Sequence, residues 1–194
     1  MNDSNVISLF PLHTVLFPGG PLPLRIFETR YTDMVRRCMR EQQPFGVLLI
    51  QEGDEAGEVA TTATVGCTAR IADFHTLSDG LLGISCVGEL KFRVSRVWRA
   101  SDGINMGEVS WLPAEPVVPL PEQYGYLAET VRRALDDLSE HYEHVERKFD
   151  DAAWVGARLT ELLPIELDDK QALLELDDPI ERLNSLLAVV PSPE

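Results

Sequence analysis

The sequence has few basic residues. It carries 17 lysines and arginines against 32 aspartates and glutamates, which gives a net charge of −15 at pH 7. Most of the negative charge lies after residue 113. Residues 114–194 hold 7 basic and 19 acidic residues, whereas residues 1–113 hold 10 basic and 13 acidic residues. Nucleic-acid phosphates are bound by clusters of lysine and arginine, so this composition argues against a nucleic-acid partner. An acidic surplus is typical of a solvated surface that promotes solubility, and the alternative is that it attracts a basic partner.

Long apolar runs are also missing. No stretch reaches the roughly 18 apolar residues that indicate a transmembrane helix. The amino terminus carries Asp3 and lacks the basic segment and apolar core of a secretory signal peptide. We therefore expect a cytoplasmic protein that is not associated with a membrane.

Only three cysteines are present, Cys38, Cys67 and Cys86. Their number is odd, they lie far apart, and each stands in an apolar helix or strand pattern. Such spacing argues against a disulfide framework and against a zinc site. We expect buried free thiols, with no bound metal or other cofactor.

Recognisable catalytic motifs are absent as well. No glycine-rich loop ends in Gly-Lys-Ser or Gly-Lys-Thr, so the phosphate-binding motif of ATPases is missing. Ser85 lies between Gly83 and Gly88, but a nucleophile elbow needs the second glycine one position earlier and a turn into a helix. His141 and His144 share a helix face, which is more typical of a solvated helix end than of a metal site. We predict that the protein is not an enzyme, and an enzyme with an unrecognised site is the first alternative.

The most distinctive stretch is residues 9–31, LFPLHTVLFPGGPLPLRIFETRY. Its prolines fix φ and its paired glycines permit a sharp turn, so we expect two short strands joined at residues 18–21. Apolar side chains alternate along residues 22–26, which predicts a strand with one buried face. Pro23 lacks an N–H and therefore indicates an edge strand. From Glu28 the apolar spacing becomes helical.

Further elements follow at short spacing. Apolar and β-branched runs predict strands at residues 45–51, 61–74, 81–98 and 104–111. Four prolines from Pro113 to Pro121 favour an extended connector, and we place a domain boundary there, between residues 1–113 and residues 114–194. Helical periodicity then predicts one helix over residues 127–145, another over 154–163, and two more that begin near Asp168 and Asp178.

Several of these segments together resemble a known family. LFPGG, LPLRIFE, RY and DMV, followed by FGVLLI from Phe45, are similar to the amino-terminal substrate-binding domain of Lon proteases, to its single-domain bacterial relatives and to the middle region of cereblon. WVGARLTELLPIE, KQALLEL and RLNSLL resemble the helical part that follows the sheet in Lon proteins. One departure is Thr29, which stands where the family usually has proline, so the start of the helix is expected to be less rigid.

The resemblance implies an α+β fold. A barrel-like β subdomain with antiparallel and mixed pairing, like the pseudouridine-synthase-associated RNA-binding (PUA-like) architecture, is expected over residues 1–113, and a small α-helical bundle over residues 114–194. The resemblance also implies a stand-alone, non-catalytic module that binds proteins with exposed apolar or extended segments, because the ATPase and Ser-Lys protease domains of full-length Lon follow the region resembled. A separate ATP-dependent protease is a candidate partner. A nucleic-acid-binding PUA-like module is the second alternative, which the net charge opposes.

A peptide can bind either by adding a strand to an exposed sheet edge or by entering an apolar groove between the subdomains. The candidate peptide-binding residues lie in the sharp turn and where the next strand becomes a helix: Pro18, Gly19, Gly20, Pro21, Arg25, Glu28 and Arg30. For the charged residues the alternative is a structural ion pair at the helix start, and for the turn it is chain reversal alone. The sequence leaves the client proteins and the oligomeric state open.

Overall fold

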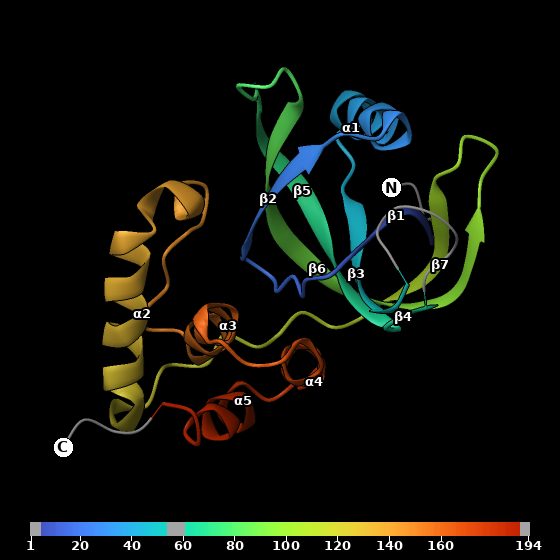
Figure 1. The fold of residues 1–194 in the computed structure, drawn as a ribbon. Helices are drawn as coiled ribbons and strands as arrows, with labels where there is room; N and C mark the ends of the chain where they lie inside the picture. Colours follow the sequence, from blue (N-terminus) through green and yellow to red (C-terminus); the bar gives the residue numbers. More distant parts are fainter. Residues whose placement is uncertain (1–4, 54–60, 191–194) are drawn as a thin grey trace.

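The computed structural model describes residues 5–53 and 61–190, and it places a barrel of strands beside a group of helices (Figure 1). The strands are β1 Val6–Leu12, β2 Pro21–Ile26, β3 Phe45–Glu52, β4 Thr61–Thr62, β5 Val65–Thr76, β6 Leu82–Arg99 and β7 Asn105–Trp111. The helices are α1 Thr29–Glu41, α2 Gly125–Asp137, α3 Ala152–Leu162, α4 Leu167–Glu175 and α5 Pro179–Leu186, with 3₁₀ turns η1 Glu122–Tyr124 and η2 Ser139–Tyr142. The expected α+β class is confirmed.

Strand pairing closes the sheet on itself. β1 pairs in parallel with β3 and antiparallel with β7, and the circuit runs from β7 through β6 and β5 back to β3. β2 stands outside this circuit, because in the described part of the chain it pairs only with β6, from Leu82 to Val87. β7 pairs with the last part of β6, from Phe92 to Arg99. One edge of β6 is therefore divided between β2 and β7.

Helix α1 packs its apolar face onto the barrel. Its N-cap is Glu28, where the change of period predicted a helix start. Four apolar side chains spaced along one face are buried: Tyr31, Met34, Val35 and Cys38. They join residues such as Phe10, Leu22 and Phe45 in one apolar cluster inside the barrel. This cluster fixes α1 beside β1 and β2, next to the site described below.

The helices after the barrel share an apolar core with it. Trp154 and Leu159 of α3 belong to the same cluster as Phe17, Leu49 and Val65 from the sheet half. Short helices persist mainly through such tertiary burial. α3 is almost completely buried, and it therefore occupies the centre of the contact between the two halves, as Figure 1 shows.

Two expected elements differ from the observed ones. The helix predicted over residues 127–145 ends at Asp137, and the short turn η2 follows. Asp136 and Asp137 put negative charge at the negative end of the helix dipole, which disfavours continuation. The strand predicted over residues 61–74 is divided into β4, which ends at Thr62, and β5, which begins at Val65, with two residues between them.

A buried ion-pair network fastens the helical half to β6. Glu115, on the connector, accepts hydrogen bonds of 2.6 and 2.8 Å from Arg182 of α5 and lies 3.1 Å from Lys91 Nζ of β6. The side chains of Arg182 and Lys91 are 0% and 2% exposed. Arg182 also donates to the carbonyls of Leu173 and Leu176, and Lys91 to those of Leu174 and Leu176 and to the Asp177 carboxylate at 3.1 Å. Burial opposes ionisation of Glu115, but Arg182 and Lys91 outweigh it and hold the pKa of that carboxyl below its usual value.

The proline-glycine turn at residues 18–21 makes the second contact between the barrel and the helical half. The Gly20 N–H donates to the Phe17 carbonyl at 3.0 Å, with Pro18 and Gly19 between them. Gly19 has a φ of 71°, so this is a type II turn with glycine at the position that needs positive φ. The chain thereby reverses into β2.

Helix α3 covers this turn with a buried ion pair. Arg158, whose side chain is 0% exposed, donates to the Pro18 carbonyl at 3.0 Å and to both carboxylate oxygens of Glu161 at 2.8 Å. Burial raises the pKa of the Glu161 carboxyl even though Arg158 favours its charged form. Gly20 lies directly under this pair, because a Cβ there would collide with Glu161 Oε1.

All three cysteines are buried free thiols, as expected. Burial raises the pKa of the Cys86 thiol to about 12, so this group is neutral and unreactive at physiological pH. In residues 5–53 and 61–190, no helix is both long enough and apolar enough to cross a membrane.

Glu115→Ala is expected to cost ~3–5 kcal/mol of unfolding free energy, because it leaves the buried Arg182 without its carboxylate partner and leaves Lys91 with Asp177 alone. Urea denaturation at pH 7 measures this loss of unfolding free energy.

The pKa of Glu115 is lowered by folding. The stability that Glu115 contributes is therefore fully present above its pKa in the unfolded chain and is lost as the pH falls through its lower pKa in the folded protein. Glu146→Ala is the control, since the Glu146 side chain is 78% exposed and its loss should change stability by less than about 0.5 kcal/mol. Equal effects of the two substitutions would contradict this account.

Gly20→Ala is expected to destabilise the protein by roughly 1–3 kcal/mol, because the added methyl overpacks the Arg158–Glu161 pair. Gly125→Ala is the matched control: no atom lies within 4 Å of a Cβ at this helical position, and alanine favours the helix by up to about 1 kcal/mol. Thermal unfolding of both variants checks the prediction. An unchanged melting temperature for Gly20→Ala would mean that the turn is not clamped by α3.

Candidate functional site

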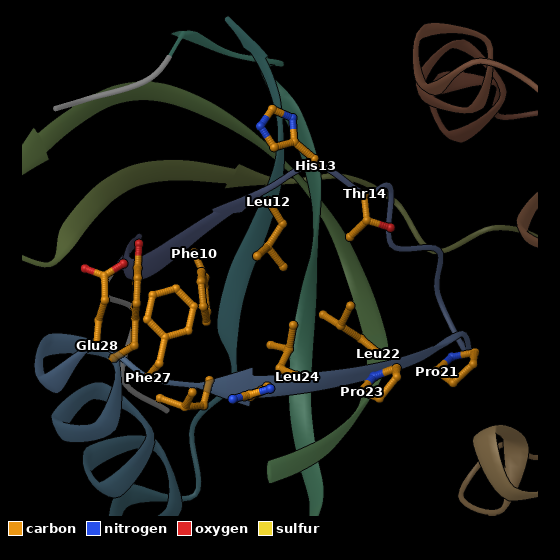
Figure 2. Close-up of a pocket in the computed structure, with 13 residues that line it drawn as sticks. Phe10, Leu12, His13, Thr14, Pro21, Leu22, Pro23, Leu24, Phe27 and Glu28 are labelled. Carbon is orange, nitrogen blue, oxygen red and sulfur yellow. The ribbon is translucent and has the colours of Figure 1, made fainter. Parts of the chain in front are cut away.

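An apolar hollow lies between β1 and β2, and we call it the β1–β2 slot (Figure 2). β1 pairs with β3 on one side, but its pairing with β7 stops at Leu9, so among the described residues nothing pairs with the other side of the rest of β1. β2 likewise pairs only with β6 among the described strands. The slot has a volume of about 420 Å³ and is lined by Phe10, Leu12, His13, Thr14, Pro21, Leu22, Pro23, Leu24, Arg25, Ile26, Phe27, Glu28 and Tyr31.

The walls of the slot are mainly apolar. Figure 2 shows Phe10 of β1 on one side and Leu22 and Leu24 of β2 on the other, with their side chains directed into the space between the strands. Tyr31 of α1 stacks on Phe10, with ring centroids 3.8 Å apart. Phe27 stands at the rim with 62% of its surface exposed. The slot therefore offers apolar contact from both strands and from the start of α1.

The prolines of β2 determine which backbone hydrogen-bonding groups its free edge presents. The Gly88 N–H donates to the Gly20 carbonyl at 2.9 Å, which sets the alternation of the β2–β6 ladder. Residues of an antiparallel strand alternate between bonding to the partner and facing away from it, so Pro21, Pro23 and Arg25 direct their backbone groups away from β6. Because proline has no N–H, this edge presents three carbonyls but only the N–H of Arg25. The prediction that Pro23 lies in an edge strand is confirmed.

The charged residues at the rim are engaged in ion pairs. Arg25 pairs with Asp79 of the turn between β5 and β6. Arg30 donates to Glu28 at 2.7 Å and to the Gly103 carbonyl at 3.1 Å. A structural ion pair at the helix start, one of the two interpretations of these residues, is therefore observed, while Arg25 and Glu28 also line the slot.

The other predicted binding residues are divided between two places. Pro21 lines the slot. Pro18 and Gly19 line a smaller hollow of about 230 Å³, between β6, the connector and α3. Gly20 is buried. Because it has no side chain, Glu161 of the same chain can approach its backbone closely. The turn is thus a contact between the two halves, and its role in binding clients stays a prediction.

Sequence reasoning missed the β1 wall of the slot: Phe10, Leu12, His13 and Thr14. The alternation of Phe10 and Leu12 around Pro11 was a weak signal for a strand with one buried face. It did not show which strand they face, because that depends on β1 pairing with β3 and leaving its other side open. Phe27 at the rim was missed because one apolar residue after a strand is an ordinary surface feature.

A third hollow, of about 260 Å³, brings together histidines that are distant in sequence. His75 of β5, His141 of η2 and His144 line it together with Ser85. Across residues 5–53 and 61–190, no cluster of three or more histidine, cysteine, aspartate or glutamate side chains has the geometry of a metal site. Ser85 lies inside strand β6, so the turn into a helix that a nucleophile elbow needs does not occur there.

Residues 6–190 match the sequence model of the ATP-dependent protease La (LON) substrate-binding domain. The chain belongs to this family. A Lon N-terminal domain protein from Xanthomonas campestris, known from a crystal structure, is 40% identical in sequence; its TM-score is 0.77, and the match covers 96% of this chain and 99% of that one. The N-terminal domain of Lon protease from the Mycobacterium avium complex shares the fold at 15% identity and a TM-score of 0.60, with 94% and 96% covered. The family expected from the motifs is confirmed.

Matches to curated proteins cover only part of those proteins. Protein cereblon from Danio rerio is 34% identical over 110 residues, which is 55% of this chain and 25% of cereblon. Lon protease from Cytophaga hutchinsonii is 24% identical over 196 residues, which is 96% of this chain and 24% of that protease. The matches therefore span about a quarter of the length of each of these two relatives.

Proposed function

We propose that this Lon substrate-binding domain is a non-catalytic recognition module that holds apolar or extended segments of other proteins in the β1–β2 slot. The single observation that carries the proposal is an apolar hollow bordered by an unpaired strand edge. Family membership supports it, because the family is described as binding the substrates of an ATP-dependent protease.

The chemistry of the slot suits a peptide better than a compact polar ligand. Its walls supply apolar contact from Phe10, Leu22 and Leu24, and its edge supplies backbone carbonyls. An unfolded segment offers the complementary groups, namely apolar side chains at alternate positions and a row of N–H groups. A separate ATP-dependent protease fits as the partner that degrades or releases what the module holds.

The nucleic-acid alternative finds no support at the slot. Arg25, which lines the slot, is paired with Asp79, and Arg30, in the first turn of α1, is paired with Glu28. A nucleic-acid surface needs unpaired basic groups in number, and the net charge of −15 works against binding a polyanion. An apolar, acceptor-rich slot on an acidic protein favours a neutral or basic polypeptide.

Leu24→Gln is expected to weaken binding of fluorescein-labelled casein, used as an unfolded client, by roughly tenfold. Full burial of a leucine side chain contributes about 1.5–3 kcal/mol; Leu24 is already partly buried in the slot wall, so a client adds only part of this, and a loss of about 1.4 kcal/mol corresponds to tenfold. Fluorescence anisotropy titration gives the affinity, and thermal unfolding shows whether the variant keeps its fold.

Val117→Gln is the matched control for Leu24→Gln. Val117 is an apolar residue of the connector that is 83% exposed and lines the hollow beside α3 rather than the slot. Its substitution should leave casein affinity unchanged. If Val117→Gln weakens binding and Leu24→Gln does not, the client site is the hollow beside α3 and the slot is not used.

We expect purified protein to hydrolyse neither casein nor ATP. The sequence has no phosphate-binding loop, and Ser85 stands in a strand with no nucleophile-elbow turn. Release of labelled casein fragments and of inorganic phosphate are the two assays. Activity that copurifies with the protein and disappears on Ser85→Ala would show that the module is an enzyme.

A further inference from the structure

We infer that the β1–β2 slot receives its client segment as an added β-strand that donates N–H groups to the carbonyls of β2, and that proline on β2 makes this edge selective. This inference rests on the proposed function and specifies how the segment is held. It concerns the backbone of Pro21, Pro23 and Arg25, the three residues of β2 that face away from β6.

The edge is an acceptor edge. Pro21 and Pro23 keep their carbonyls but have no N–H, so only Arg25 both donates and accepts. An added strand must therefore supply the N–H groups itself. A segment with free N–H groups opposite the carbonyls of Pro21 and Pro23 satisfies them, whereas its own carbonyls at those positions gain nothing from β2.

The same chemistry disfavours pairing between two copies of this protein. If β2 of one molecule were laid along β2 of another, neither strand would bring donors at Pro21 or Pro23, and carbonyls would face carbonyls. Natural sheets protect exposed edges from self-pairing in such ways. β2 is therefore a poor partner for β2 of a second molecule, but it can still pair with an unfolded segment that has a complete set of N–H groups.

Side-chain direction adds a second rule. Leu22 and Leu24 point into the slot, whereas Pro23 and Arg25 are exposed. In an added strand, the residues opposite Leu22 and Leu24 put their side chains into the slot. The residues between them lie opposite Pro21, Pro23 and Arg25; they bind through their N–H groups and turn their side chains to solvent. The slot thus selects apolar residues at alternate positions and excludes proline at the positions between them.

Backbone N-methylation tests the first rule on the unmodified protein. The probe is a short fluorescent peptide of alternating leucine and serine with a lysine at each end, compared with versions that are N-methylated at the serines or at the leucines. We expect serine methylation to weaken binding at least tenfold, because it removes the N–H groups that reach β2, and leucine methylation to weaken it less than threefold. Equal weakening by both versions would overturn the strand-addition mode while leaving the proposed function standing.

Pro23→Ala provides an independent arm, because it restores a donor to the free edge. The variant is expected to bind the unmodified peptide about two- to tenfold more tightly, the change that one added hydrogen bond produces, and to show more self-association in sedimentation velocity. Unchanged or weaker binding by a variant with normal thermal stability would overturn the inference. If the unmodified peptide does not bind the wild-type protein and labelled casein does not bind either, the proposed function fails together with it.

Discussion

One edge of β6 is shared by two strands, and the site depends on that division. β2 occupies the first part of the edge and β7 the last part, while β1 reaches β7 only as far as Leu9. The barrel circuit therefore closes at one end and stays open at the other, between β1 and β2. Prolines in β2 preserve this opening, since a strand without two of its outward N–H groups is a poor partner for β1. An apolar slot results where a fully closed barrel would have none.

The helical half holds this arrangement from outside the slot. Arg158 and Glu161 clamp the turn that leads into β2, and Glu115 ties Arg182 of α5 to Lys91 of β6. Buried ion pairs add little net stability, yet removing one partner is costly. Their main effect here is therefore to fix the positions of the segments that they join. They fix the start of β2, which borders the slot, and the middle of β6, the strand with which β2 pairs.

Local pattern predicted a good part of this structure. The alternation of Leu22, Leu24 and Ile26 gave the buried face of β2, and Pro23 marked its free edge. The family motifs indicated the α+β class. Long-range contacts were not predictable, because Pro18 and Arg158 are 140 positions apart and nothing near either residue indicates the other. For that reason the contact between Gly20 and Glu161 was not predicted, and the role of the proline-glycine turn in binding clients stays a prediction. The β1 wall of the slot was missed for the same reason.

Site-specific photo-crosslinking tests the central claim, that unfolded segments occupy the β1–β2 slot. A photoreactive phenylalanine analogue is placed at Phe27, on the exposed rim of the slot, or at Leu90, which is 48% exposed and lines the hollow beside α3. Labelled casein should crosslink at position 27 and not at position 90, and excess unlabelled casein should compete. Crosslinking at position 90 alone would contradict the account and place the client between the two halves of the protein.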